Sequence, residues 1–253
     1  MADHDPVPGA AGRSPGAYAA FLRHASGDAD VVGLVLMGSR GAGAYVTEAS
    51  DHDLIVVVRG DVERWQTPHG APVETWPMSL EQFRSHGLPG SDDAWNRPAF
   101  LDATVVLDRL DGEIARLTRE KGVLTADEAE SVAATGLGDY LNSLYRSLRN
   151  LEAGRDLEGR LDALESIGPL LTTVFALEGR VRPFNKWLRL ELTRRPLALD
   201  GLLDLVERIA SDPTTEAQRA AFRRVEAAAR AAGHGAIVDG WRPDVDWLRG
   251  EPG

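Results

Sequence analysis

The sequence contains no cysteine among its 253 residues. This absence excludes disulfide bridges, thiolate zinc sites, iron–sulfur clusters and cysteine nucleophiles, and it fits a reducing compartment such as the cytoplasm. Long apolar runs are also missing, because the longest aliphatic stretch, 54–58, is far short of the ~20 residues that a membrane helix needs. The N-terminal residues lack the pattern of a signal peptide. We therefore expect a cytoplasmic protein with no membrane partner.

Basic residues are scarce, with 28 Lys and Arg against 39 Asp and Glu and a formal net charge of −11. An acidic chain repels phosphate backbones, so nucleic acid is not an expected partner. The sequence also lacks a Walker A loop, a zinc-binding His-Glu-x-x-His helix and a Gly-x-Ser-x-Gly nucleophile elbow, and its six histidines share no ligand-like spacing. These gaps argue against transition-metal and serine-hydrolase chemistry.

The first half of the chain carries the strand-like segments. We expect residues 1–13 to be a disordered tail and a helix to run from Ser14 to His24. β-rich runs follow at 31–37, 52–58, 72–76 and 103–107, with a short helix capped by Ser79 between the last two. This alternation predicts an α/β domain over residues 14–122.

The second half of the chain is predicted to be helical. Thr125 and Glu128 form a capping-box pattern, and leucines then repeat at three- and four-residue spacing from Leu137 to Leu151. Further helices are predicted at 157–177, 184–193, 202–209 and 215–232, the first of them with a buried stripe that includes Leu161 and Leu164. The whole chain is thus predicted to be α+β, with a helical bundle over residues 123–253.

The most informative pattern is a pair of aspartates at the start of an apolar strand. Asp51 and Asp53 are two residues apart, so they project to the same face of the strand while His52 points to the other. Two carboxylates ~7 Å apart are unfavourable unless they are solvated or a cation lies between them, and hard oxygen ligands select Mg²⁺. The pair therefore predicts a magnesium site.

A glycine-rich turn precedes the aspartates and follows another apolar strand. Gly38 permits a tight turn, and the backbone amides of Gly38, Ser39, Arg40 and Gly41 can form an anion-binding concavity, to which Ser39 adds a hydroxyl donor. A magnesium site facing a phosphate cradle is what nucleotidyl transfer requires. We therefore expect nucleotidyl transfer, with a nucleoside triphosphate as the nucleotide and Mg²⁺ as the metal.

The pattern Met37-Gly38-Ser39, eleven residues and then Asp51-His52-Asp53-Leu54 resembles the signature of the nucleotidyltransferase superfamily typified by DNA polymerase β. His52 departs from this signature, which has an apolar residue there. The resemblance implies an N-terminal α/β nucleotidyltransferase domain with a short mixed sheet, followed by a helical bundle, as in the aminoglycoside adenylyltransferases. It also implies a third carboxylate on a neighbouring strand.

Glu74 is the candidate for that third carboxylate, because it is the one charged residue in the strand-like run 71–76. Its resemblance to the strand glutamate of the aminoglycoside adenylyltransferases implies a general base toward the acceptor hydroxyl, with metal contact as the open alternative. The competing interpretation is that Glu74 faces solvent at the edge of the sheet. Glu63, Glu81 or Asp102 would then be the third carboxylate.

Further site residues are weaker candidates. Residues 175–188 resemble a segment in the bundles of such enzymes, which implies that Lys186, supported by Arg180 or Arg182, reaches the ATP phosphates. Glu165 borders the predicted apolar stripe of its helix, where it would bind substrate ammonium groups or simply remain at the surface. Trp76 and Trp95 are candidates for stacking on adenine or substrate, or for packing.

The leading hypothesis is transfer of AMP from ATP to a hydroxyl of a small acceptor such as an aminoglycoside, with pyrophosphate released. The acidic balance of the chain agrees with a cationic acceptor. The alternatives are an antitoxin-like enzyme that adenylylates a protein and a catalytically silent nucleotide-binding protein. The sequence leaves a monomer and a homodimer equally open.

Overall fold

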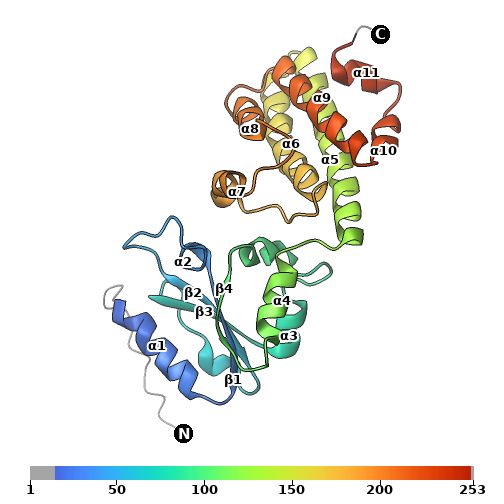
Figure 1. Ribbon diagram of the computed structural model, residues 1–253. Coiled ribbons are helices and arrows are strands. Elements are labelled where there is room, and N and C mark those ends of the chain that lie inside the picture. The colour runs from blue at the N-terminus through green and yellow to red at the C-terminus, as the bar shows by residue number, and fades with distance from the viewer. Residues whose placement is uncertain (1–14, 252–253) are drawn as a thin grey trace. The chain divides into compact units, whose positions relative to one another are not determined.

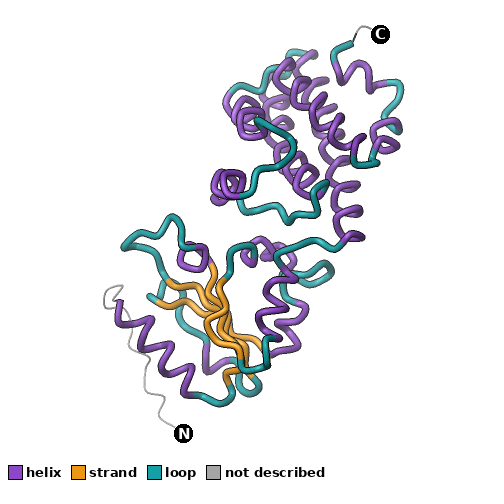
Figure 2. Tube along the Cα trace, viewed as in Figure 1, coloured by secondary structure: helices purple, strands orange, loops and turns teal. Residues whose placement is uncertain are grey.

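The computed structural model describes residues 15–251 and divides between Gly122 and Val123 into two compact units. The predicted tail, residues 1–13, lies outside the described residues. The strands belong to the first unit, whereas the described part of the second unit is built from helices and loops (Figures 1 and 2). This arrangement confirms the predicted α+β class.

The first unit is organised by a four-stranded mixed sheet in the order β3-β2-β1-β4. Strand β1 pairs antiparallel with both β2 and β4, and β2 pairs parallel with β3. The strands are β1 (Val31–Met37), β2 (His52–Val58), β3 (Val73–Ser79) and β4 (Thr104–Asp108). Strand β3 runs through Pro77, where the sequence pattern predicted its end, because a proline is tolerated in a strand at the sheet edge.

Apolar layers cover both faces of this sheet. Helix α1 (Pro15–Gly27) packs on one face, where Ala25 joins Leu34, Leu54 and Val56 in one cluster. The other face buries Val35, Ile55 and Val57 against α3 (Leu80–Ser85), α4 (Glu113–Lys121) and the 3-10 helix η2 (Ala94–Phe100) (Figure 1). Because β1 and β2 are covered on both faces, their sequences are nearly continuous runs of valine, isoleucine and leucine.

Short elements complete the first unit. Helix α2 (Gly38–Ala42) directly follows β1, and the 3-10 helix η1 (Glu63–Trp65) lies between β2 and β3. The expected cap of α3 is present, since Ser79 and Gln82 form a capping box. The sequence analysis missed α4, a helix of only nine residues that follows Asp111 and Gly112, both with positive φ.

The second unit is helical, as predicted. The Thr125–Glu128 capping box begins the long helix α5, whose Leu137, Leu141, Leu144 and Leu148 are buried. The segment predicted as one helix over 184–193 is instead a 3-10 turn followed by α7. The elements of this unit are α5 (Ala126–Glu152), α6 (Asp156–Ala176), η3 (Asn185–Trp187), α7 (Leu188–Arg194), α8 (Leu202–Ser211), α9 (Thr215–Ala231), α10 (Gly235–Asp239) and α11 (Asp244–Arg249).

The predicted stripe on α6 is wrong at two positions. Leu161 and Leu164 are 53% and 45% exposed, whereas Ala163, Leu170 and Phe175 are buried. The packing against α5 uses the face that carries the small residues Gly159, Ala163 and Ser166 in the first half of α6, because these let the two helices approach closely. The leucine spacing alone therefore predicted a different face of α6 from the one that packs against α5.

Within residues 15–251, none of the helices combines the length and the apolar character that a membrane span would need.

Lys121 gives the first unit a measurable pH dependence. Its side chain is buried over the rings of Phe83 and Phe100 and its Nζ donates to the Arg84 carbonyl oxygen at 2.9 Å, and this burial lowers the pKa of Lys121 to about 8. The unfolded chain keeps this proton to a pH of about 10.4, so folding becomes more favourable as pH rises between those values.

We therefore expect the free energy of unfolding of the wild type, relative to Lys121→Met, to rise between pH 8 and pH 10 by about 2 kcal/mol. Urea unfolding of both proteins at several pH values measures this difference. Parallel pH profiles for the two proteins would contradict the assignment.

Candidate functional site

Three carboxylates converge where β2 and β3 begin. Asp51 directly precedes β2, Asp53 is its second residue, and Glu74 is the second residue of β3. The parallel register pairs Asp53 with Glu74, so both lie on the same sheet face, where Asp51 joins them by its two-residue spacing. One oxygen from each of the three lies within 4.8 Å of the others, and all three side chains are half-buried.

This convergence favours Glu74 over the competing carboxylates. Glu63, Glu81 and Asp102 are not part of the acidic cluster found among residues 15–251. Glu74 is only 16% exposed, which excludes the interpretation of a solvent-facing residue at the sheet edge. The structure thus brings together the three residues that the sequence analysis nominated for metal binding, and their roles stay a prediction.

The turn after β1 is shaped around Asp53. Gly38 has φ +63°, a conformation that residues with a side chain rarely adopt. A Cβ at Gly38 would also collide with Oδ2 of Asp53. The backbone at Gly38 and the Asp53 carboxylate are therefore in direct apposition, and a side chain at position 38 would both strain the backbone and displace the carboxylate.

Arg40 holds the loop that leads to the aspartates. Its Nε and Nη2 donate to the carbonyl oxygen of Ser50 at 3.2 and 3.0 Å. Gly41 allows α2 to lie against β1, because a Cβ there would collide with the Leu36 carbonyl oxygen. Arg40, nominated for phosphate binding, thus fixes the backbone immediately before Asp51, and Ser39 occupies the first turn of α2 beside it.

His52, the departure from the superfamily signature, faces the other side of the sheet. Its ring stacks on Tyr18 of α1, with centroids 4.0 Å apart and planes at 11°. Burial, with a smaller contribution from Arg40, lowers the pKa of His52, which keeps the ring neutral and suited to stacking. The histidine therefore takes the packing role of an apolar residue without approaching the carboxylates as a ligand.

His69 is a site residue that the sequence analysis missed. Its Nδ1 lies 2.7 Å from Oε1 of Glu74, and this hydrogen bond with its attendant charge raises the pKa of His69. The imidazole is 96% exposed, so it contacts Glu74 from the solvent side. His69 lies in an irregular loop, and the sequence of this loop has no repeating pattern that would predict a contact with Glu74.

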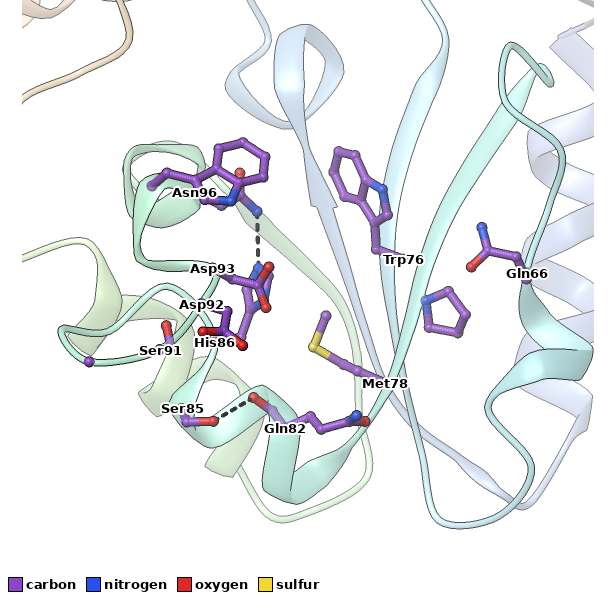
Figure 3. Close-up of a pocket in the computed structure, with 13 residues that line it drawn as sticks. Gln66, Trp76, Met78, Gln82, Ser85, His86, Ser91, Asp92, Asp93 and Asn96 are labelled. Atoms are coloured by element: carbon purple, nitrogen blue, oxygen red, sulfur yellow. Dashed lines mark hydrogen bonds and ion pairs between the residues drawn. The ribbon is translucent and has the colours of Figure 1, made fainter.

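A pocket of about 570 Å³ is lined partly by Trp76 and Met78, which share a face of β3 with Glu74, and none of the three clustered carboxylates lines it. Trp76 lies two residues beyond Glu74 on β3, and Figure 3 shows Trp76 and Met78 facing His86, Asp93 and Asn96. The lining residues are Gln66, Trp76, Pro77, Met78, Gln82, Ser85, His86, Gly90, Ser91, Asp92, Asp93, Trp95 and Asn96. Both nominated tryptophans, Trp76 and Trp95, thus belong to one pocket.

The remaining nominated residues belong to the second unit. Arg180 forms an ion pair with buried Glu191, a structural role that links the segment after α6 to α7. Glu165 is a surface residue paired with Arg146 at 3.0 Å, in agreement with its competing interpretation. Lys186 is exposed in η3, with its Nζ 4.8 Å from the centroid of the Trp187 ring.

Arg182 differs from its neighbours in being partly buried. It donates to Asn185 Oδ1 at 2.7 Å and lines a pocket of about 420 Å³ between α5 and α6, and burial lowers its pKa. Its Nε is buried without a hydrogen-bond partner among the described residues.

Comparison with known proteins leaves the family of the chain open. No protein-family model matches the chain. No curated protein matches it either. Among solved structures, the chain is similar to the crystal structure of a nucleotidyltransferase-like protein from Exiguobacterium sibiricum, with 14% sequence identity, a TM-score of 0.47 and coverage of 89% of this chain and 78% of that chain. The chemistry is therefore inferred from the residues of this chain.

Substitution of Gly38 tests the link between the turn and the carboxylates. We expect Gly38→Ala to weaken Mn²⁺ binding at least tenfold, because the added methyl group displaces the Asp53 carboxylate. Isothermal titration with MnCl₂ measures the affinity.

Gly43→Ala is the matched control. Gly43 also has a positive φ, +61°, but a Cβ there meets nothing within 4 Å. Both variants carry a conformational cost of about 1 kcal/mol, and only Gly38→Ala should lose the metal. Equal Mn²⁺ affinity in the two variants would refute the apposition.

Proposed function

We propose that the protein is a Mg²⁺-dependent nucleotidyltransferase that transfers AMP from ATP to a hydroxyl of a small acceptor. The observation that carries this proposal is the cluster of Asp51, Asp53 and Glu74 oxygens within 4.8 Å, next to the Gly38 turn. Two unit charges at this separation repel by roughly 3 kcal/mol at an effective dielectric constant of about 20. Such a cluster is stabilised by a divalent cation.

The donor set suits Mg²⁺ in particular. All three groups offer hard carboxylate oxygens, and half-burial leaves room for water and phosphate oxygens in the same coordination shell. Asp51 and Asp53 would hold the ion, with Glu74 as a third ligand or as the base. When bound, Mg²⁺ neutralises charge on the triphosphate and on the transition state.

The residues of this chain then supply orientation and proton transfer. Backbone amides at Gly38 to Arg40 and the Ser39 hydroxyl would bind the triphosphate, while Arg40 keeps the Ser50–Asp51 backbone in place. The acceptor hydroxyl oxygen forms a bond to the α-phosphorus, the bond to pyrophosphate breaks, and Glu74 takes the hydroxyl proton. Products are an adenylylated acceptor and pyrophosphate.

The finer assignments follow the sequence hypothesis. An aminoglycoside is the leading acceptor, which would make the protein an antibiotic-modifying adenylyltransferase of the cytoplasm. The preference for adenine belongs to the same proposal.

Removal of one metal-binding charge tests the reaction. We expect Asp53→Asn to abolish Mg²⁺-dependent pyrophosphate release from ATP, measured across a panel of aminoglycosides, and to leave the fold intact because it relieves repulsion. Asp111→Asn is the control, since Asp111 is exposed, lies outside the cluster and has a positive φ that asparagine tolerates. Wild-type turnover by Asp53→Asn would refute the metal assignment, and silence of the wild type with every acceptor would refute small-molecule transfer.

Glu74→Gln separates the two roles of Glu74. If Glu74 is the base, turnover should fall by roughly 10²-fold or more while Mn²⁺ affinity stays within about twofold. If Glu74 is the third ligand, Mn²⁺ affinity should fall with turnover. Titration and steady-state rates on the same preparation distinguish these outcomes, and unchanged turnover would remove Glu74 from the site.

A further inference from the structure

Helix α6 carries a row of leucines that its own unit leaves exposed. Leu157, Leu161 and Leu164 are 67%, 53% and 45% exposed, and we call these three residues the leucine row. Their spacing places them on one side of the helix, opposite the face of Ala163 and Ser166 that packs against α5 (Figure 1). Single exposed leucines are ordinary, whereas a contiguous apolar row on a helix marks a contact surface.

The same stripe continues along α6 into the core of the unit. Leu171 and Phe175 extend the alternating three- and four-residue spacing, and both are buried. The chain that follows α6 turns back over this half, where the Arg180 guanidinium lies 5.1 Å from the centroid of the Phe175 ring. A Cβ on Gly168 would lie 3.6 Å from Nη1 of Arg182. The unit therefore covers the stripe beyond Gly168 and leaves the leucine row before it uncovered.

Charges of opposite sign flank the leucine row. Helical spacing places Arg160 along one side of the row and places Glu158 and Glu165 along the other. Within residues 15–251, Arg160 is exposed and takes part in no ion pair. Glu165 pairs with Arg146 at 3.0 Å but is still 65% exposed. An apolar row with one basic and one acidic flank is the arrangement of a helix that pairs with another helix.

These flanking charges distinguish the two ways in which two copies of the row can face each other. In a parallel pair of helices, each basic flank meets the acidic flank of the other copy, so Arg160 faces Glu165 of the second copy twice. In an antiparallel pair centred on Leu161, like flanks meet, so Arg160 faces its own equivalent and Glu158 faces Glu165. Like charges in such positions are destabilising. The row is therefore complementary to itself in the parallel direction.

We propose that the leucine row binds a second copy of this chain, in a parallel and two-fold symmetric dimer along the first half of α6. A two-fold interface uses the same surface on both copies and must be complementary to itself. Each leucine of the row then packs on its equivalent, and Arg160 pairs with Glu165 across the contact. Leu161 and Leu164, which the sequence predicts to be buried, are buried in this dimer. The proposal does not depend on the proposed function.

Sedimentation equilibrium of the full chain tests the dimer. We expect a dissociation constant on the order of 10 µM, because the two rows make a smaller contact than a permanent dimer has. The mean mass should therefore rise from monomer toward dimer between about 1 and about 200 µM protein. Leu161→Asp should weaken the dimer at least about tenfold, because it brings two carboxylates into the apolar centre of the contact. A wild type that stays monomeric over this range would overturn the proposal.

Val46→Asp is the matched control for Leu161→Asp. Val46 is 45% exposed and belongs to the loop between α2 and β2 in the first unit. Its substitution also replaces an exposed aliphatic side chain with a carboxylate, so the dissociation constant should stay within about twofold of the wild type. An equal loss in the two variants would reduce the effect to net charge and contradict a contact through the leucine row.

Exchange of the flanking charges tests the direction of the helices with substitutions at exposed positions only. Arg160→Glu and Glu165→Arg should each weaken the dimer about fivefold, because each variant brings like charges together twice. The double variant should restore the affinity, since the pairs are then re-formed with exchanged signs. In an antiparallel dimer Glu165→Arg would face Glu158 and strengthen the association, and that result would overturn the parallel arrangement.

A single introduced thiol gives an independent test of direction. The chain has no cysteine, so Leu157→Cys carries one thiol per copy. In the parallel dimer the two thiols face each other, and oxidation with diamide should link the copies through a disulfide. In an antiparallel dimer centred on Leu161 they would lie about 12 Å apart along the helix, beyond the reach of a disulfide. Val46→Cys is the control that should stay unlinked, and a dimer in which Leu157→Cys is not linked would overturn the proposed arrangement.

Discussion

Mutual repulsion among three carboxylates is the constraint on which the candidate site depends. Asp51, Asp53 and Glu74 come from two chain segments, and the parallel pairing of β2 with β3 brings them together. A shift of that register by one residue would turn Glu74 to the opposite face and leave only the two aspartates. The parallel pairing of β2 with β3 therefore determines the geometry of the carboxylate cluster as well as that of the sheet.

The apolar layers oppose this repulsion. In β2 the first two residues are half-buried and the next five, Leu54–Val58, are buried, so the strand passes from the site directly into the core. Burial of such a run between α1 on one face and α3 and α4 on the other fixes the position of the carboxylates. Gly38 completes this arrangement, because its lack of a side chain lets the β1–α2 turn lie against Asp53.

Sequence patterns predicted the parts of the structure that are periodic. The strands 31–37 and 52–58 coincide with β1 and β2, because continuous aliphatic runs of this length mark strands buried on both faces. Asp51 and Asp53 were nominated from their two-residue spacing and their resemblance to the superfamily signature, and Glu74 was nominated as the one charged residue of a strand-like run. Leu161 and Leu164 show the limit of this reasoning: leucine spacing identified a helix, but the choice of the packed face depended on small residues that let α5 approach.

Residues in irregular segments had no such signal. His69, Asp92 and Asp93 lie in loops, where the chain path is set by tertiary contacts such as His86 with Asn96 rather than by a repeating pattern. Trp76 and Trp95 were nominated as separate aromatic residues, and only the fold shows that one pocket contains both. The composition shows that the whole chain is acidic. Where the charges lie relative to one another can be seen only in the structure.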